Sequence, residues 1–327
     1  MSRVFDALQK SQGEIPGASP LAQDHPESVP VEASASVAPA IPAVPEEVPS
    51  VLADMPVIGT EGMRAPSAAD GRWLNVPADR ILHPHPMPEQ RLVSIAEPDS
   101  PGAEMFRVLS TRLAHIQRKR RLQKLLITSS EGDEGKSVIT ANLAFSIARR
   151  PNTRVLLVEA DLRRPTASAL LTSSPLRGIT EWNEEKLQLE DALYRVNDLP
   201  LWFLSAGRGI DEPMPLLESE RFARMLETVS ALFNWVLLDA TPLLPMADST
   251  SLSRLCDGVL VVVREGYTRR KVLNKALGSI EKNKVIGMVL NQASMLKIGY
   301  DHYYGNKNGK AKKEVKAEGD QVPAATA

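Results

Sequence analysis

Short apolar runs separated by amphipathic segments dominate the chain from about residue 91 to residue 291. The runs are KLLITS (124–129), RVLLVEAD (154–161), LWFLSA (201–206), WVLLD (235–239), GVLVVV (258–263) and VIGMVLN (285–291). Runs that are apolar without alternation are typical of strands covered on both faces. Between them, apolar residues recur at helical spacing, as in Val138, Ala141, Phe145 and Ala148, or Phe222, Met225, Leu226 and Val229. This alternation predicts an α/β domain over residues 91–298, with a mostly parallel sheet flanked by helices.

Both ends of the chain lack this periodicity. Residues 1–90 hold 14 of the 25 prolines and, with 12 acidic and 5 basic residues, carry a charge of −7, whereas the whole chain carries −1. A segment of this composition buries too little apolar surface to offset its ordering entropy. We therefore expect a mostly disordered arm over residues 1–90 and a flexible tail over residues 299–327. The opening SRVFDALQKSQ could form a short helix, either transient or a docking peptide.

Composition narrows the classes of protein further. The single cysteine, Cys256, excludes an internal disulfide and fits a reducing cytoplasm, and we expect it to be a buried, small apolar residue. No apolar run approaches the roughly 18–20 residues that span a bilayer, so we expect membrane association only through a partner. The basic run RKRR (118–121) lies at a predicted helix C-terminus, where cations are favoured. We interpret it as a solvated face, with contact to anionic lipid or a partner as the alternative, and expect no nucleic-acid binding.

The first apolar run leads into a candidate phosphate-binding loop. The sequence SEGDEGKS, from Ser130 to Ser137, ends in Gly-Lys-Ser between a predicted strand and a predicted helix, which is the context of a P-loop. Backbone N–H groups of such a loop hold phosphates. Lys136 would reach the β- and γ-phosphate oxygens, and the Ser137 hydroxyl would bind Mg²⁺. Ser130 stands where the pattern has glycine, yet the context predicts a P-loop NTPase fold.

Two aspartates end other predicted strands. Asp161 lies in VLLVEADLRRP, and Asp239 lies in WVLLDATPLLPMAD. Ligands of open α/β sheets bind at the carboxyl ends of the strands. We therefore expect both aspartates to join the P-loop around one Mg²⁺–phosphate cluster. Taken singly, either aspartate could instead cap the helix that follows it.

These motifs, in this order, resemble those of the deviant Walker ATPases and, among them, the bacterial tyrosine kinases of the CpsD/CapB type, which serve polysaccharide export. The resemblance covers about residues 95–305. The segment EPDSPGAEMFRVLSTRL (97–113) is similar to the family's helix before the P-loop, ADLRRP to its second acidic motif, and LLDATPLLPMADS to its third. The segments LSAG (204–207) and GMVLN (287–291) also match.

The resemblance implies a tyrosine autokinase that uses ATP and Mg²⁺. It implies that Lys136, Asp161 and Asp239 are catalytic, and that Ser137, Asp161 and Asp239 surround the metal. The residues expected to bind nucleotide are Ser130, Glu131, Gly132, Asp133, Glu134, Gly135, Lys136, Ser137, Val138 and Asn291, the last of them against adenine. Phosphate would pass to a C-terminal tyrosine cluster, usually on a neighbouring subunit.

That cluster corresponds here to Tyr300, Tyr303 and Tyr304, three of only five tyrosines in the chain. The family's helix before the P-loop also mediates assembly, so the resemblance implies a homo-oligomer joined through Glu104 and Arg107. It further implies a separate transmembrane polysaccharide co-polymerase (Wzz/CapA-like) as the activating adaptor. The kinase would then be cytoplasmic, held at the inner face of the plasma membrane by that partner.

Several positions depart from the family pattern. Gly132-Asp133 stands where the loop usually reads Pro-Gly, Glu159 replaces the first aspartate of the second motif, and Ser110 replaces the second arginine of E-x-x-R-x-x-R. These changes leave ring assembly and full transfer activity open. A MinD/ParA-like ATPase switch is one alternative, although those proteins carry a second loop lysine where this chain has Glu131. A regulatory scaffold that binds nucleotide without turnover is another.

Overall fold

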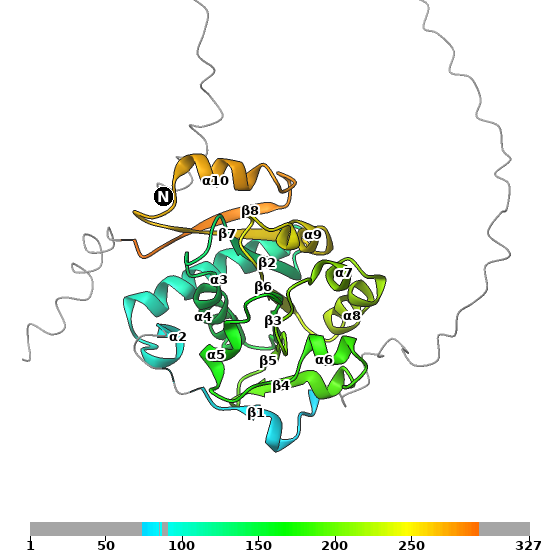
Figure 1. The fold of residues 1–327 in the computed structure, drawn as a ribbon. Coiled ribbons are helices and arrows are strands. Elements are labelled where there is room, and N and C mark those ends of the chain that lie inside the picture. The colour runs from blue at the N-terminus through cyan, green and yellow to red at the C-terminus, as the bar shows by residue number, and fades with distance from the viewer. Residues whose placement is uncertain (1–73, 85, 87–90, 294–327) are drawn as a thin grey trace, which may run out of the picture. The chain divides into compact units, whose positions relative to one another are not determined.

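The computed structural model describes residues 74–84, 86 and 91–293, and they contain one eight-stranded sheet (Figure 1). The strands are β1 Ile81–Leu82, β2 Lys124–Ser129, β3 Val155–Glu159, β4 Leu193–Val196, β5 Leu201–Leu204, β6 Trp235–Asp239, β7 Gly258–Arg264 and β8 Val285–Asn291. Their order across the sheet is β1-β4-β5-β3-β6-β2-β7-β8. Every neighbouring pair is parallel except β4 and β5, which are antiparallel. The predicted mostly parallel sheet is therefore confirmed.

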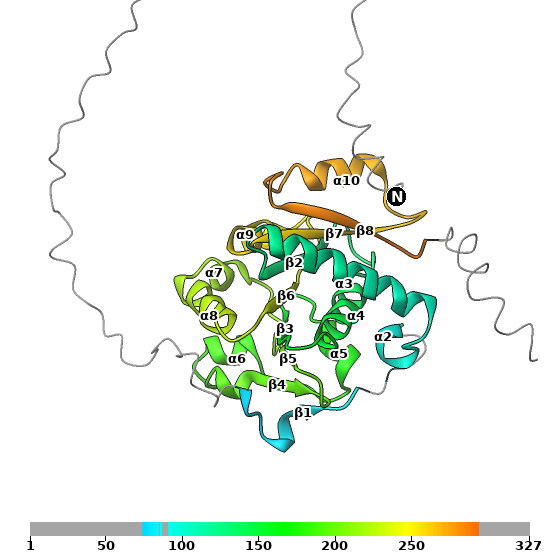
Figure 2. The same ribbon diagram turned by 180° about the vertical axis from the view of Figure 1, so that it is seen from behind.

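Helices cover both faces of this sheet, as Figures 1 and 2 show from opposite sides. The α-helices are α2 Val93–Ala96, α3 Pro101–Lys119, α4 Lys136–Ala148, α5 Ala167–Leu171, α6 Ile179–Asn183, α7 Met214–Leu217, α8 Glu220–Ser230, α9 Asp248–Leu255 and α10 Arg270–Leu277, with 3₁₀ turns at Ala78–Arg80 and Glu190–Ala192. Helices α3, α4 and α5 lie on one face, and α6 to α9 lie on the other. Among the described residues, no helix is long and apolar enough to cross a membrane.

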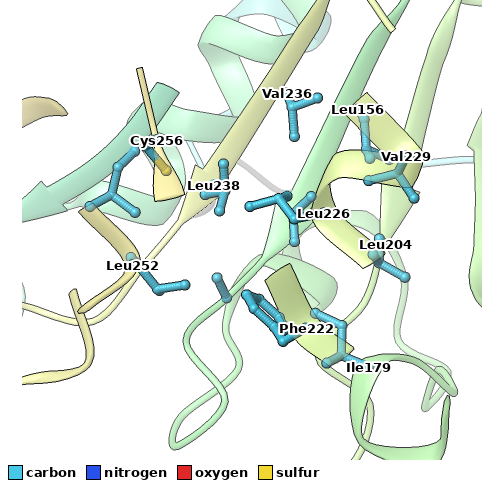
Figure 3. Close-up of a cluster of buried hydrophobic side chains, with 14 of the residues drawn as sticks. Leu156, Ile179, Leu204, Phe222, Leu226, Val229, Val236, Leu238, Leu252 and Cys256 are labelled. Carbon is cyan, nitrogen blue, oxygen red and sulfur yellow. The ribbon is translucent and has the colours of Figure 1, made fainter. Parts of the chain in front are cut away.

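Alternate residues of each central strand enter two separate hydrophobic cores. Leu156, Val236 and Leu238 pack under α8 and α9, where Figure 3 shows them beside Leu226 and Val229. Their chain neighbours on the same strands enter the second core, under α3 and α4; these are Val155, Leu157, Trp235 and Leu237. Because both faces of β3 and β6 are buried, the strands read as continuous apolar runs.

Local signals fix where the long helices begin. Ser100 and Ser219 are the N-caps of α3 and α8, and each hydroxyl accepts a hydrogen bond from a backbone N–H three residues on. Helix α4 is buried almost all round, because α2 and α3 pack over the side that faces away from the sheet. Cys256, the C-cap of α9, is buried as expected, and desolvation raises the pKa of its thiol to about 12.

Two strands were not predicted from the sequence. The chain enters the sheet at β1, within the segment expected to be a disordered arm, so the fold begins before residue 91. Strands β1 and β4 form one sheet edge and are two and four residues long, too short for a recognisable apolar run. Strand β8, at the other edge, is only half-buried along most of its length. The tyrosine cluster (Tyr300, Tyr303 and Tyr304) and the tail lie outside the described residues.

Candidate nucleotide-binding site

The loop between β2 and α4 has the backbone of a tight phosphate-binding turn. Gly135 adopts a φ of 88°, a conformation that favours glycine, and a Cβ there would lie 2.3 Å from Nδ2 of Asn291 and displace that amide. Asp133 also has a positive φ, 59°, which aspartate tolerates better than most residues. Its side chain is exposed, so the added negative charge is solvated. Helix α4 then begins at Lys136.

Glu134 braces the loop from inside. The residue is completely buried, and its Oε2 accepts hydrogen bonds from the backbone N–H groups of Ser130, at 2.6 Å, and Glu131, at 3.1 Å. Its other oxygen accepts from the hydroxyl of Thr268. A buried carboxylate is stable only when it is hydrogen-bonded in this way. The structure places the Glu134 carboxylate under the loop, and the expected contact of this residue with nucleotide stays a prediction.

Two segments far along the chain hold the loop from outside. Arg264, at the end of β7, donates from Nη1 to the Asp133 carbonyl at 3.1 Å. Asn291, at the end of β8, donates from Nδ2 to the Glu134 carbonyl at 2.9 Å. The amide that the resemblance assigned to adenine therefore binds the loop backbone here, while its adenine contact stays a prediction.

The two strand-end aspartates lie beside the loop, as expected from the sheet. Ile127 on β2 and Glu159 on β3 both pair in register with Asp239 on β6, so three adjacent strands end together. Asp161 receives an ion pair from Lys136, with Nζ 3.2 Å from Oδ2, and its Oδ1 accepts the Arg164 N–H at 3.0 Å. The structure thus gathers a lysine and two carboxylates at one edge.

Asp239 is the least satisfied of these groups. It is fully buried, its Oδ2 has no hydrogen-bond partner among the described residues, and Oδ1 receives a long contact of 3.4 Å from Thr140. Desolvation raises the pKa of Asp239 to about 7, although Lys136 opposes the shift. Nearby, the Ser137 hydroxyl lies 2.8 Å from that of Thr166. A hydroxyl and an orphaned carboxylate oxygen beside a phosphate loop fit Mg²⁺, which takes one or two carboxylates and completes its shell with water and phosphate.

Glu159 pairs in register with Asp239, and its carboxylate is held by neighbouring segments of the chain. Its Oε1 accepts the N–H of Ser168 at 2.9 Å, and its Oε2 accepts the N–H of Ala206 at 3.2 Å. The hydroxyls of Ser168 and Ser205 donate to it as well. Burial still raises the pKa of Glu159, because these hydrogen bonds only partly compensate for desolvation. The longer side chain thus ties α5 and the segment after β5 to β3.

Sequence reasoning did not find three residues of this site. Thr166 touches Ser137. Arg264, the last residue of β7, and Thr268, which follows that strand, hold the loop. All three come from irregular segments or a strand end without a motif of their own, so only the folded contacts reveal them. Arg163, from the second acidic motif, forms an ion pair with Asp248, with Nε 2.7 Å from Oδ2. This contact joins the second and third motifs.

The residues expected at a subunit interface lie on α3. Arg107 donates from Nε to Glu104 at 2.6 Å and from Nη1 to the Pro98 carbonyl at 2.7 Å. Ser110, which replaces the motif's second arginine, is buried, and its hydroxyl donates to the Arg107 carbonyl. An interface through Glu104 and Arg107 stays a prediction.

Comparisons with known proteins place the chain in a family of nucleotide-binding domains. The family model described as the CobQ/CobB/MinD/ParA nucleotide binding domain matches residues 125–296, just over half of the chain. Tyrosine-protein kinase YwqD of Bacillus subtilis is 29% identical over 222 residues, covering 67% of this chain and 93% of that protein. Succinoglycan biosynthesis transport protein ExoP of Rhizobium meliloti is 28% identical over 271 residues, covering 78% of this chain and 34% of that protein.

Solved structures of related proteins share the fold. The crystal structure of the chimerical protein CapA2B2 matches with a TM-score of 0.59 at 25% identity, over 68% of this chain and 97% of that one. The kinase domain of the Escherichia coli tyrosine kinase ETK matches with a TM-score of 0.58 at 25% identity, over 64% and 88% of the two chains.

Proposed function

Since the chain belongs to the CobQ/CobB/MinD/ParA nucleotide-binding domain family, we propose that it is an ATP- and Mg²⁺-dependent protein-tyrosine kinase that acts on itself. The observation that carries the proposal is the convergence of Lys136, Asp161 and Asp239 at the braced loop. Relatives named tyrosine-protein kinase, such as YwqD, support the choice of reaction. Relatives named for polysaccharide synthesis, such as ExoP, support a role in regulating capsular or exopolysaccharide synthesis and export.

Each residue of the site has its own role in the proposed phosphoryl transfer. The loop N–H groups and Lys136 bind and orient the phosphates of ATP, and Ser137 and Asp239 hold the cation. Mg²⁺, when bound, neutralises charge that develops on the phosphate oxygens. Asp161 accepts a hydrogen bond from the tyrosine hydroxyl and takes its proton as the phenolic oxygen attacks the γ-phosphorus. A P–O bond to tyrosine forms, the P–O bond to ADP breaks, and Asp161 keeps the proton.

We place the acceptors in the tyrosine cluster of the tail. Strand β8 ends at Asn291, whose side chain contacts the phosphate loop, so the last strand of the sheet ends beside the nucleotide site. Tyr300 follows nine residues later, a length that extends to at most about 30 Å. Such a tail could enter the site of an adjacent copy. Phosphorylation would add roughly −1.5 to −2 charge per tyrosine and weaken docking near the acidic loop.

Two proteins of the comparisons support the proposed partner. ExoP is named a transport protein and CapA2B2 a chimera, and both match this chain over most of its length. We propose a transmembrane polysaccharide co-polymerase as the adaptor that holds the kinase at the inner face of the plasma membrane, and a homo-oligomer of kinase subunits.

Two variants separate binding from transfer. Lys136→Met should abolish the rise in Tm that ATP and Mg²⁺ produce, because a ligand that binds only the native state stabilises it. Asp161→Asn should keep that rise and lose most phosphotyrosine formation, measured by immunoblot and mass spectrometry. An unchanged ATP-dependent Tm shift in Lys136→Met contradicts the site. Undiminished phosphotyrosine formation in Asp161→Asn would show that another group accepts the proton of the tyrosine hydroxyl.

The alternatives give different products in the same assay. A MinD/ParA-like switch would release inorganic phosphate without phosphotyrosine. A regulatory scaffold would bind ATP without consuming it. Glu131 counts against a MinD/ParA-like switch, because those proteins have a loop lysine at that position. In this chain the Glu131 backbone N–H donates to the Glu134 carboxylate.

A further inference from the structure

A cavity lies between α2, α3 and the C-terminal end of α4. Helices α2 to α4 can be found in Figure 2. Its volume is about 200 Å³. Since a water molecule in the liquid takes roughly 30 Å³, the cavity has room for a group considerably larger than water. Its walls include Arg107, Ser110, Ser146, Arg149 and Arg150.

Three arginines and no carboxylate line this cavity. Arg107 is fixed by Glu104 and by the Pro98 carbonyl. The guanidinium groups of Arg149 and Arg150 have no ion pair or hydrogen bond among the described residues. Guanidinium groups stay charged at any physiological pH. Glu104 balances Arg107, so the uncompensated charges at this cavity are those of Arg149 and Arg150.

The hydroxyl groups of the cavity point to the same kind of ligand. Ser94, Ser110 and Thr111 already donate, the first to the Asn142 carbonyl and the other two to the Arg107 carbonyl. The buried Ser146 hydroxyl has no partner among the described residues. A buried hydroxyl without a partner is unfavourable, and an acceptor in the cavity would satisfy it.

We propose that this cavity binds a phosphate monoester, with the phosphate between Arg149, Arg150 and Arg107 and an oxygen accepting from Ser146. Arginine forks match phosphate oxygens in pairs, and a phosphate dianion balances two cations. The space beyond the phosphate, beside Ala103 and the aliphatic stems of the arginines, would hold the esterified carbon group. The site is separate from the nucleotide loop and does not depend on the kinase activity.

Isothermal titration of the full chain tests this site. The probes are inorganic phosphate, O-phosphotyrosine and a hexose phosphate, each at matched ionic strength. The two esters should bind more tightly than inorganic phosphate, and the tighter ester identifies the source as protein tyrosine or sugar. Titration of Lys136→Met excludes the nucleotide loop, because ester binding should persist in that variant. Ester binding to this variant is expected even if the protein is not a kinase.

The double variant Arg149→Gln/Arg150→Gln should weaken ester binding about tenfold or more, since charged hydrogen bonds contribute this much. The matched control is Arg118→Gln/Lys119→Gln, which removes two charges from the exposed last turn of α3 and should change binding less than about twofold. Ser146→Ala should weaken it about threefold and keep the native Tm.

Two results would overturn the proposal. One is absence of ester binding to the wild-type chain. The other is equal binding by the wild type and by a folded Arg149→Gln/Arg150→Gln variant. If that variant only lowered Tm, whether or not ester was present, the arginines would serve the C-terminus of α4, where cations are favoured.

Discussion

Asp239 ends β6 with a buried carboxylate, one oxygen of which has no partner among the described residues. Beside it lie Lys136 and Asp161, which form an ion pair with each other. Asp239 is therefore the group whose surroundings are least satisfied before ligand binds. This arrangement is typical of functional sites, where burial and nearby charge shift the pKa of a carboxyl group.

The nucleotide-free protein should lose stability through Asp239 as pH rises. The pKa is about 7 in the folded state and 3.8 without burial, so between these values the folded state keeps a proton that the unfolded state has lost. The free energy of unfolding then falls with rising pH, at up to about 1.4 kcal/mol per unit. Asp239→Asn removes this pH-dependent contribution to the free energy of unfolding. Its stability relative to wild type should rise by on the order of 2 kcal/mol from pH 5 to pH 7, measured by urea unfolding without Mg²⁺.

The same substitution should act in the opposite direction on ligand binding. Asp239→Asn should reduce the Tm shift produced by ATP with Mg²⁺, because one proposed ligand of the cation is lost. Identical pH dependence of unfolding in wild type and Asp239→Asn would contradict the burial argument, whatever happened to nucleotide binding.

At the scale of elements, the ends of β7 and β8 hold the nucleotide loop in place. Arg264 and Asn291 contact the loop carbonyls, and Thr268 contacts Glu134 beneath them. These contacts join the edge of the sheet to its centre. A change at the end of β8 would therefore reach the phosphate loop directly.

Thr268→Val tests this bracing with a side chain of similar shape. The variant removes a donor to the buried Glu134 and the acceptor of the Arg264 N–H at 2.9 Å. A buried polar group left without its partner costs about 1–3 kcal/mol. We expect a corresponding loss of stability and about tenfold weaker ATP binding by titration.

Thr268→Ser keeps the hydroxyl and is the control for packing. It should bind ATP within about twofold of wild type, since the hydrogen bond is retained. If valine and serine behaved alike, the Thr268 hydroxyl would have no part in holding the loop.

At the scale of the whole molecule, the pattern of apolar residues predicted the central strands of the sheet and missed the two strands β1 and β4 at one edge. Strands β2 and β6 fall where their apolar runs lie, because burial on both faces leaves a continuous signal. Strands β1 and β4 have no such signal, since their place depends on pairing with each other and with β5. The sequence likewise placed Lys136, Ser137 and Asp161 in a motif. It could not show that Glu134 lies under the loop, because nothing in spacing reveals which way a loop side chain points.

Transfer between two copies of the chain is the central claim, and a mixing experiment measures it most directly. One variant carries Tyr300, Tyr303 and Tyr304 changed to Phe and keeps the nucleotide site. The other carries Lys136→Met and keeps the tyrosines. After incubation with ATP and Mg²⁺, neither variant alone should form phosphotyrosine, and the mixture should form it in the tail of the Lys136→Met chain, as mapped by mass spectrometry. Consumption of ATP by the mixture with all of its γ-phosphate released as inorganic phosphate would contradict the account.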